Sequence, residues 1–401
     1  MRTVLGIAAI ACLLLAAMRP SQAQTYTVLH AFTTGGDGAN PRGALVRDSS
    51  GDLYGTTLSG GTSGYGTVFK LSRSGEETVL YSFKGGSDGQ GPTGKIQAAD
   101  GNLYGSTYAG GPSGAGIVFM VNKAGKETAL YSFCSQSKCS DGDSPNGGVI
   151  RDANGNLYGT TYSGGAYNGG TVFMLSKAGK ERVLYTFCSQ SGCADGGGPL
   201  AGLIQDTKGN FYGTTSGGGA YGGGVVFKLN TTGEETVLYS FCSQRGCDGV
   251  APIAGVIRDR IGNLYGTTSG YQSNCQGSGC GVVFKLSKSG KEAALHSFTG
   301  GADGGEPFES GVIRDAAGNL YGTTLIGGAS NIGVLFELSK GGKETVLYNF
   351  CSQSKCSDGA SPNVGVIRDS KGNLYGTTYY GGDPACGESG VGCGVVFKLT
   401  P

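Results

Sequence analysis

The chain has 401 residues, of which 80 are glycine, and its 30 basic and 29 acidic side chains nearly cancel. The glycines follow no Gly-X-Y triplet, which excludes collagen, and the 38% of apolar residues are patterned, which excludes a disordered chain. The near-neutral charge argues against a nucleic-acid partner, and the lack of Trp with only two His narrows the options for catalysis.

Residues 1–23 are predicted to be a secretory signal peptide. The apolar run Val4–Ala17 follows a basic residue, and Ser21-Gln22-Ala23 places small residues at the −3 and −1 positions of a cleavage site. The alternative is a lipoprotein signal that uses Cys12, but this residue lies inside the apolar run. We expect a mature chain that begins at Gln24, has no membrane span, and is secreted or periplasmic.

One phrase recurs seven times in the rest of the chain. Its commonest form, at residues 155–161, reads Gly-Asn-Leu-Tyr-Gly-Thr-Thr. A period of about 50 to 56 residues indicates a repeat architecture, with one supersecondary unit in each copy. The tyrosines of the phrase are Tyr54, Tyr104, Tyr158, Tyr212, Tyr265, Tyr321 and Tyr375.

Each copy is expected to contain four short strands. In the third copy they are predicted at 148–152, 156–161, 170–175 and 182–187. The short connections favour antiparallel neighbours, and strands that are apolar on both faces need cover on both sides, as in the blades of a propeller. Gly159 and its equivalents lie inside the second strand, which predicts a bulge or the close approach of a neighbouring backbone.

The two ends of the chain complement each other. Residues 27–32 read as a fourth strand without a first three, and Val395–Leu399 reads as a third strand without a fourth. Pairing them completes a seventh blade, so residues 24–401 are predicted to be one all-β domain, a monomeric seven-bladed β-propeller with four antiparallel strands per blade. The alternative is a linear β-solenoid, which needs a cap at each end, and neither end has an atypical repeat.

The repeat resembles a known family. Gly-Asn-Leu-Tyr-Gly-Thr-Thr is followed by Gly-Gly, by Val-Phe-Lys-Leu and by Gly-Lys-Glu-Thr-Val-Leu-Tyr-Ser-Phe, and this pattern is similar to the GloVer tandem-repeat family of exported bacterial proteins over residues 25–400. The strand order is also similar, more loosely, to NHL-type and streptogramin-lyase-like propellers. The resemblance implies an exported propeller and no particular activity.

The chain has 13 cysteines, and all except Cys12 fall into close pairs. An even number, short spacing and export together predict disulfides. Zinc is the alternative, but the pairs lack CxxC spacing and His partners. No metal or other cofactor is therefore predicted. The pairs are Cys134/Cys139, Cys188/Cys193, Cys242/Cys247, Cys275/Cys280, Cys351/Cys356 and Cys386/Cys393.

The connections between strands are expected to sort onto two faces. Turns between the first and second and between the third and fourth strands are tight, whereas the other two connections are longer and gather on the opposite face. Every connection between blades contains Asp-Gly-x-x-Pro, which we interpret as a structural turn, with a ring of calcium ligands as the alternative. The aspartates are Asp37, Asp88, Asp141, Asp195, Asp248, Asp303 and Asp358.

The longer loops carry the predicted binding residues. Tyrosines offer a flat apolar face and a hydroxyl, so we predict a non-enzymatic protein that binds an extracellular carbohydrate, cell-wall or protein ligand. The tyrosines that follow the second strands are Tyr108, Tyr162, Tyr167, Tyr221, Tyr271, Tyr379 and Tyr380.

Two other functions stay open. A lyase or hydrolase would use carboxylates that break the sevenfold pattern, and a purely structural surface protein would need no site at all. No catalytic residue is predicted, and His30 and His296, which replace the tyrosine of the fourth strand, are interpreted as packing residues. The carboxylates that break the pattern are Asp143, Glu306, Glu309, Asp383 and Glu388.

Overall fold

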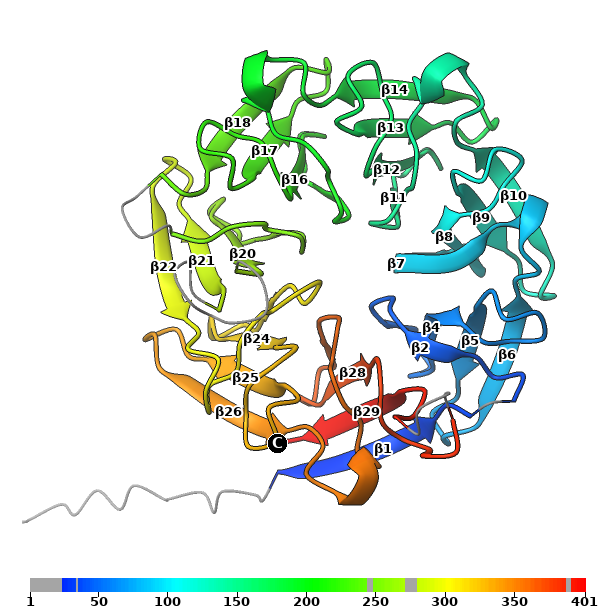
Figure 1. Ribbon diagram of the computed structural model, residues 1–401, viewed down its shortest axis with the longest axis vertical. Coiled ribbons are helices and arrows are strands. Elements are labelled where there is room, and N and C mark those ends of the chain that lie inside the picture. The colour runs from blue at the N-terminus through cyan, green and yellow to red at the C-terminus, as the bar shows by residue number, and fades with distance from the viewer. Residues whose placement is uncertain (1–23, 34, 244–247, 271–279, 387–390) are drawn as a thin grey trace, which may run out of the picture.

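The computed structural model describes residues 24–33, 35–243, 248–270, 280–386 and 391–401. The chain forms a ring of seven antiparallel sheets around a central axis (Figure 1). Six sheets have four strands, and the first has five because the short strand β2 (Ala39–Pro41) also pairs with its second strand. The predicted seven-bladed β-propeller is confirmed.

Each blade runs from an innermost first strand to an outermost fourth strand. The first strands are β3 (Val46–Arg47), β7 (Gln90–Ala99), β11 (Val149–Arg151), β15 (Ile204–Gln205), β19 (Ile257–Arg258), β23 (Ile313–Arg314) and β27 (Ile367–Arg368). The second strands are β4 (Leu53–Ser59), β8 (Asn102–Ala109), β12 (Leu157–Thr161), β16 (Phe211–Thr215), β20 (Leu264–Thr268), β24 (Leu320–Thr323) and β28 (Leu374–Thr378). The third strands are β5 (Thr67–Leu71), β9 (Ile117–Val121), β13 (Thr171–Leu175), β17 (Val225–Leu229), β21 (Val282–Leu286), β25 (Val334–Leu338) and β29 (Val395–Thr400). The fourth strands are β6 (Glu77–Ser82), β10 (Glu127–Ser132), β14 (Glu181–Thr186), β18 (Glu235–Ser240), β22 (Glu292–Ser297), β26 (Glu344–Asn349) and β1 (Thr25–Ala31).

The N-terminal strand closes the ring. β1 pairs antiparallel with β29, from Thr25 opposite Thr400 to Ala31 opposite Val395, and Figure 1 shows the two ends of the chain side by side in blue and red. The predicted closure is confirmed, with the strand two residues longer at its start and one shorter at its end than the predicted 27–32. Closure leaves no blade without its outer strand, so β29 is covered and does not become an additional open edge.

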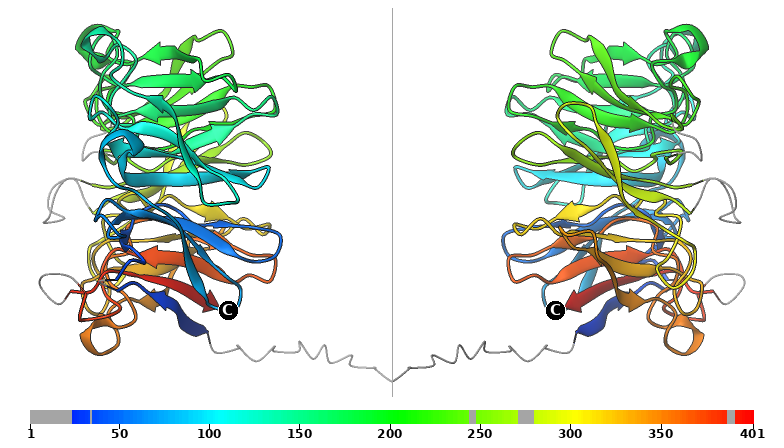
Figure 2. Two further views of the ribbon diagram at one scale, coloured as in Figure 1. Left: turned by 90° about the vertical axis from the view of Figure 1, so that its right-hand side faces the viewer. Right: turned by 90° about the vertical axis from the view of Figure 1, so that its left-hand side faces the viewer.

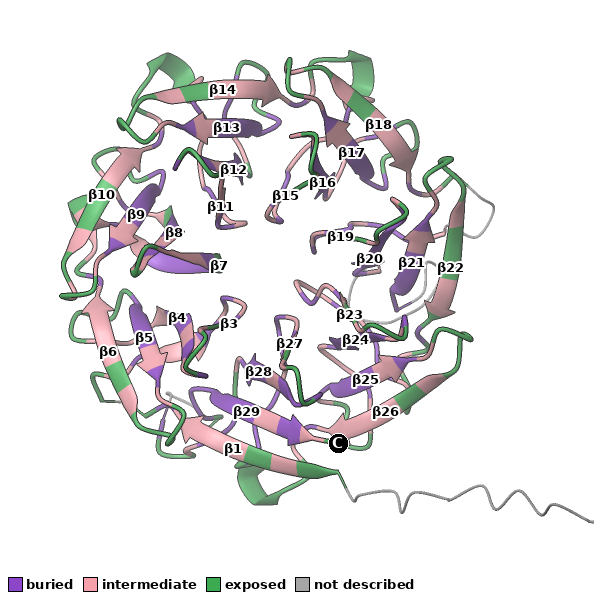
Figure 3. Cartoon of the chain, turned by 180° about the vertical axis from the view of Figure 1, so that it is seen from behind, coloured by how far each residue is buried: buried purple, intermediate pink, exposed green. Residues whose placement is uncertain are grey.

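The core lies between the blades, in the second and third strands (Figure 3). A phenylalanine in each third strand lies against the glycine of the second strand. A Cβ added to Gly159 would come within 2.7 Å of Phe173 Cζ, so only glycine leaves room for the ring. The close neighbour is thus mainly a phenyl ring rather than the predicted backbone, and the register shift lies between β13 and the fourth strand.

The connections from each fourth strand to the next blade contain the only helical turns in the described part of the chain. Four of them hold three-residue 3-10 helices, η1 (Gly86–Asp88), η2 (Ser137–Cys139), η3 (Ser191–Cys193) and η4 (Ser354–Cys356). The sequence pattern did not predict them, because three residues are too few to show a helical period. None of the described helices is long and apolar enough to cross a membrane.

The two faces of the ring differ (Figure 2). One face, the tight-turn face, carries the turns between first and second strands and between third and fourth strands. The other, the loop face, carries the 3-10 helices and the loops between second and third strands. Bridges join these two kinds of loop within a blade, for example Asp143 with Ser163 and Ala360 with Tyr380.

Candidate functional site

The tight-turn face repeats one set of contacts around the ring. In the third blade the Tyr158 hydroxyl donates to Asp152 Oδ2 at 3.0 Å. Between blades, the Arg258 guanidinium lies over the Tyr212 ring of the preceding blade, 5.6 Å from its centroid. Contacts that recur in this way join the blades, so this face forms the structural frame of the ring.

The aspartates of the Asp-Gly-x-x-Pro turns are also bound internally. Asp195 is fully buried and accepts hydrogen bonds from the Tyr185 hydroxyl at 2.8 Å and from both the N–H and the hydroxyl of Ser189. His30 replaces the tyrosine in one copy and lies 3.2 Å from Asp37. These donors support the structural interpretation of the motif, and among the described residues no group of three or more His, Cys, Asp or Glu is arranged so that it could hold a metal ion.

Four of the predicted cysteine pairs are disulfides in the structure. Three of them close connections that hold a 3-10 helix, and the fourth, Cys386–Cys393, closes a loop of the seventh blade. Cys242 and Cys280 are also disulfide-bonded, and their predicted partners, Cys247 and Cys275, lie outside the described residues. Disulfides on this scale indicate a compartment outside the reducing cytosol.

A cavity of about 520 Å³ runs along the axis of the ring, which is the size range of small-molecule sites. It is lined by the first strands and by the segments that lead into them. Leu200, Ile253 and Val364 are among its apolar lining residues. Three cationic side chains and one carboxylate also line the cavity, which makes it positive in a chain that is nearly neutral: Arg42, Lys95, Arg151 and Glu309.

An ion pair bridges the loop-face end of this cavity. Arg42 leads into the first blade and Glu309 into the sixth, so their contact spans the seventh blade. Arg42 Nε donates to Glu309 Oε2 at 3.0 Å, and Nη2 donates to Oε1, which makes the pair bidentate. Burial alone would lower the pKa of Arg42, but the hydrogen bonds and charge of Glu309 raise it above its ordinary value.

Lys95 extends from the innermost strand of the second blade into the cavity. Lys95 is solvent-exposed within the open cavity, and the channel atoms around it lower the pKa of its ammonium by partial desolvation. No hydrogen bond or ion pair of this ammonium occurs within the described residues. The other blades have glycine or alanine at the same position: Ala44, Gly148, Gly202, Gly255, Gly311 and Gly365.

The structure divides the predicted tyrosines into two groups. Tyr108 and Tyr379 lie within electrostatic reach of Arg42, and the Tyr162 ring lies over Gly198, two residues before a residue of the cavity wall. None of these three tyrosines lines the cavity itself, and because they lie close to residues that do, we refer to Tyr108, Tyr162 and Tyr379 as the mouth tyrosines. Tyr167 and Tyr221 form the second group, the tip tyrosines, and each is 59% exposed.

The remaining predicted tyrosines are placed as follows. Tyr380 packs edge-on against Tyr379 with ring centroids 4.7 Å apart, and Tyr271 lies outside the described residues. The sequence analysis missed Tyr65, which is exposed on the equivalent loop of the first blade.

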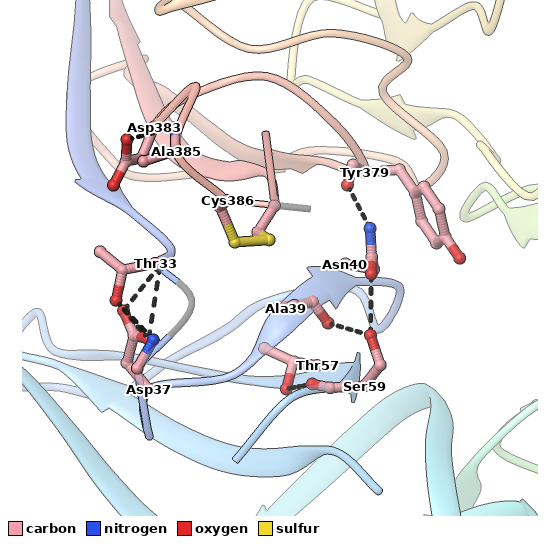
Figure 4. Close-up of a disulfide and its surroundings, with 12 residues drawn as sticks. Thr33, Asp37, Ala39, Asn40, Thr57, Ser59, Tyr379, Asp383, Ala385 and Cys386 are labelled. Carbon is pink, nitrogen blue, oxygen red and sulfur yellow. Dashed lines mark hydrogen bonds between the residues drawn. A yellow bond between two sulfur atoms is a disulfide. The ribbon is translucent and has the colours of Figure 1, made fainter. Parts of the chain in front are cut away.

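The cross-linked loop of the seventh blade is tied to the segment that carries Arg42 (Figure 4). Asn40 Nδ2 donates to the Tyr379 carbonyl at 3.0 Å, and Asn40 N donates to the Cys393 carbonyl at 2.8 Å. Ser59 Oγ donates to Asn40 Oδ1 at 2.8 Å, which fixes the amide. The disulfide therefore helps to hold a mouth tyrosine next to Arg42.

The carboxylates of the enzymatic alternative do not form one group. Glu309 is bound to Arg42, Asp143 accepts from the Ser144 hydroxyl, and Asp383 accepts from the Ala385 N–H. Burial raises the pKa of Glu306. Glu388 lies outside the described residues. No hydrogen bond joins two of the four described carboxylates, whose positions lie in three different blades.

The sequence analysis also missed Arg42 and Lys95. The sequence did contain a signal that could have pointed to Arg42. The residue after the proline of each Asp-Gly-x-x-Pro turn is of six different types in seven copies, although the turn itself repeats. These residues are Arg42, Thr93, Asn146, Leu200, Ile253, Phe308 and Asn363. In the sixth copy one additional residue follows, and it places Glu309 at the cavity.

The fold and the cavity together define the class of protein. It is a seven-bladed β-propeller whose axial channel is lined by apolar and charged side chains. A model of the Gloeobacter/Verrucomicrobia repeat matches residues 16–205 and 189–397, so the chain belongs to this repeat family. No curated protein matches the chain.

The chain is also similar, at low identity, to solved structures. A luciferin-regenerating enzyme is 13% identical with a TM-score of 0.43, covering 94% of this chain and 95% of its own. A puromycin hydrolase variant is 12% identical with a TM-score of 0.47, covering 84% of this chain and 50% of its own.

Proposed function

We propose that this protein is an exported, monomeric, non-enzymatic propeller that binds a carbohydrate at the loop-face end of its central channel. The observation that carries the proposal is the variation after the proline of the inter-blade turns. Positions whose side chains hold the ring together have the same residue in most blades. The position after the proline, in contrast, has six different residue types in seven copies. Four of these residues line the cavity: Arg42, Asn146, Leu200 and Ile253.

The surroundings of the cavity suit a sugar. A sugar ring has an apolar C–H face and a rim of hydroxyls, and the mouth tyrosines offer aromatic faces with a hydroxyl at the edge. Asn146 and the Arg42–Glu309 pair supply hydrogen-bonding groups beside them. A cavity of about 520 Å³ favours the end of a narrow chain over the surface of a globular protein.

Export completes the proposal. Residues 1–23 would act as a secretory signal, and residues 24–401 would form the propeller in the periplasm or outside the cell. The disulfides support this location, because such bonds persist in oxidising compartments.

The test is a glycan array followed by calorimetry on the mature chain. In the variant Tyr108→Ala/Tyr379→Ala, we expect the affinity for a captured glycan to fall at least tenfold, about 1.4 kcal/mol. The matched control is Tyr167→Ala/Tyr221→Ala, which removes two tip tyrosines and should change the affinity less than twofold. An equal loss in both variants, or no captured glycan, would contradict the proposal.

The enzymatic alternative is tested on the same protein. A broad panel of hydrolase and lyase substrates should give no turnover. Turnover that disappears in Glu309→Gln or Asp383→Asn would replace the binding function with a catalytic one.

A further inference from the structure

We propose that the glycan is acidic, and that Lys95 binds a carboxylate of its terminal sugar inside the channel. The inference rests on the proposed function and adds the chemical class of the ligand. It also explains why this blade has a lysine at a position where the contacts shared by all seven blades do not need one.

The first argument is position. Lys95 is the one long side chain at a place where the other six blades have glycine or alanine. Its backbone pairs with Gly148 of the next blade, so the strand that carries it is fixed in the wall of the channel. A lysine at this place is not needed to form a blade, because six blades form without one.

The second argument is charge. Arg42 is bound to Glu309, and Arg151 Nη2 lies 2.8 Å from Asp100 Oδ2. Lys95 is thus the one cationic group of the cavity lining without an ion pair among the described residues. An ammonium without an ion pair can accept an anionic partner, and a cavity with excess positive charge attracts one from solution.

The third argument is the shape of the opposite wall. Leu200 and Ile253 lie in the fourth and fifth blades and give that part of the cavity wall an apolar surface. One side of the cavity is therefore apolar and the other cationic. A uronic acid has the matching form, because its ring has a C–H face and its C6 carbon carries one carboxylate.

The choice of carboxylate over phosphate follows from the number of donors. Phosphate sites in proteins combine several charges or forked guanidinium donors with backbone N–H groups. Among the described lining residues, the one cation without an ion pair is a lysine, a compact point charge that matches one monoanion.

The experiment compares each acid with its own neutral form. Oligomers of galacturonate, glucuronate and mannuronate, and the methyl ester of each, are titrated into the mature chain by calorimetry. We expect at least one acid to bind at least tenfold more tightly than its ester, with an affinity that falls as NaCl is raised. Lys95→Gln should lose this preference, Lys95→Arg should retain most of it, and Lys177→Gln on the tight-turn face should retain all of it.

The outcomes separate the two proposals. Esters that bind as tightly as acids, or acids that bind Lys95→Gln within twofold of the parent, would overturn the role of Lys95 and leave carbohydrate binding standing. Sulfated oligosaccharides that bind more tightly than every uronate would overturn the carboxylate. Failure of every saccharide to bind would overturn both proposals. Unchanged melting temperatures of the Lys95 variants show that altered binding is not a result of misfolding.

Discussion

The two faces of the ring differ in what the repeats keep constant. On the tight-turn face, tyrosine, aspartate and arginine recur from blade to blade with nearly the same distances, as in the Tyr158–Asp152 and Tyr375–Asp369 hydrogen bonds of 3.0 and 3.1 Å. At the loop-face end of the channel, the residue after the proline changes with almost every blade. A repeat protein separates scaffold from site in this way, because sevenfold contacts build the ring and departures from them can serve a ligand.

The wall of the channel also contains a regular part and an irregular part, and the hydrogen bonds of the second-strand hydroxyls show the difference. In the third to sixth blades a second-strand hydroxyl donates to the next blade, as from Thr160 to the Ala201 carbonyl at 2.9 Å and from Thr214 to the Ala254 carbonyl at 3.0 Å. The equivalent hydroxyls of Thr56, Ser106 and Thr377 are buried and have no partner in the described part of the chain. The segments that carry Arg42 and Lys95 therefore do not accept the hydroxyl hydrogen bond that the segments of the apolar wall accept. The missing bonds lower stability locally, as is common at functional sites.

The largest effect is expected from breaking the ring itself. Deleting residues 24–33 removes β1, whose Tyr26 stacks on Tyr348 at 3.7 Å, together with the fully buried Phe32. Loss of two packed aromatic residues and exposure of β29 as an edge should lower the melting temperature by about 10 °C or more and cause aggregation. Scanning calorimetry and size-exclusion chromatography measure both, and an unchanged transition would show that the ring does not depend on this strand.

The closure of the ring and its strand order could be predicted from the sequence because they depend on repetition. Seven copies of one pattern average out local ambiguity, and the unmatched strands at 27–32 and Val395–Leu399 left one way to complete a blade. The channel residues could not be found in that way. Arg42 and Glu309 are distant in sequence, and the contact between them depends on ring geometry and on one additional residue in the sixth copy.

A second prediction compares the frame with the channel. Asp195→Ala leaves the Tyr185 hydroxyl and two donors of Ser189 without their buried acceptor, which should cost about 3 kcal/mol of unfolding free energy. Leu200→Asn introduces the residue that two other copies carry at the same place, and should cost less than about 1 kcal/mol. Urea denaturation measures both, and equal costs would remove the distinction between frame and channel.

A third prediction concerns pH and the outer rim. Burial and the charge of Asp141 raise the pKa of Glu181 from 4.5 to about 7, and burial and the charge of Asp195 do the same for Glu235. A carboxyl group with a raised pKa binds its proton more tightly in the folded state. Its contribution to stability is therefore fully present below pH 4.5 and is lost as the pH rises through 7.

We therefore expect a melting temperature several degrees lower at about pH 8 than at about pH 5.5, an effect moderated by the partial exposure of these groups. Glu181→Gln/Glu235→Gln should reduce the difference. A melting temperature that is flat or rises over this interval would contradict the raised pKa values.

The disulfides provide the last comparison, because one of two short cross-linked loops belongs to the frame and the other adjoins the site. Cys188–Cys193 and Cys386–Cys393 close short loops, so replacing either pair with serine should cost at most about 2 kcal/mol in the chain-entropy model. Only the second loop is bonded to Asn40, through the carbonyls of Tyr379 and Cys393.

Loss of Cys386–Cys393 should therefore loosen a mouth tyrosine and weaken glycan binding about threefold to tenfold, because ordering the loop then opposes binding. Loss of Cys188–Cys193 should lower the melting temperature by a few degrees and leave the affinity within twofold. Calorimetry of both double-serine variants with one captured glycan makes the comparison. Equal affinities would show that the cross-linked loop of the seventh blade belongs to the frame, and that Tyr379 is positioned without it.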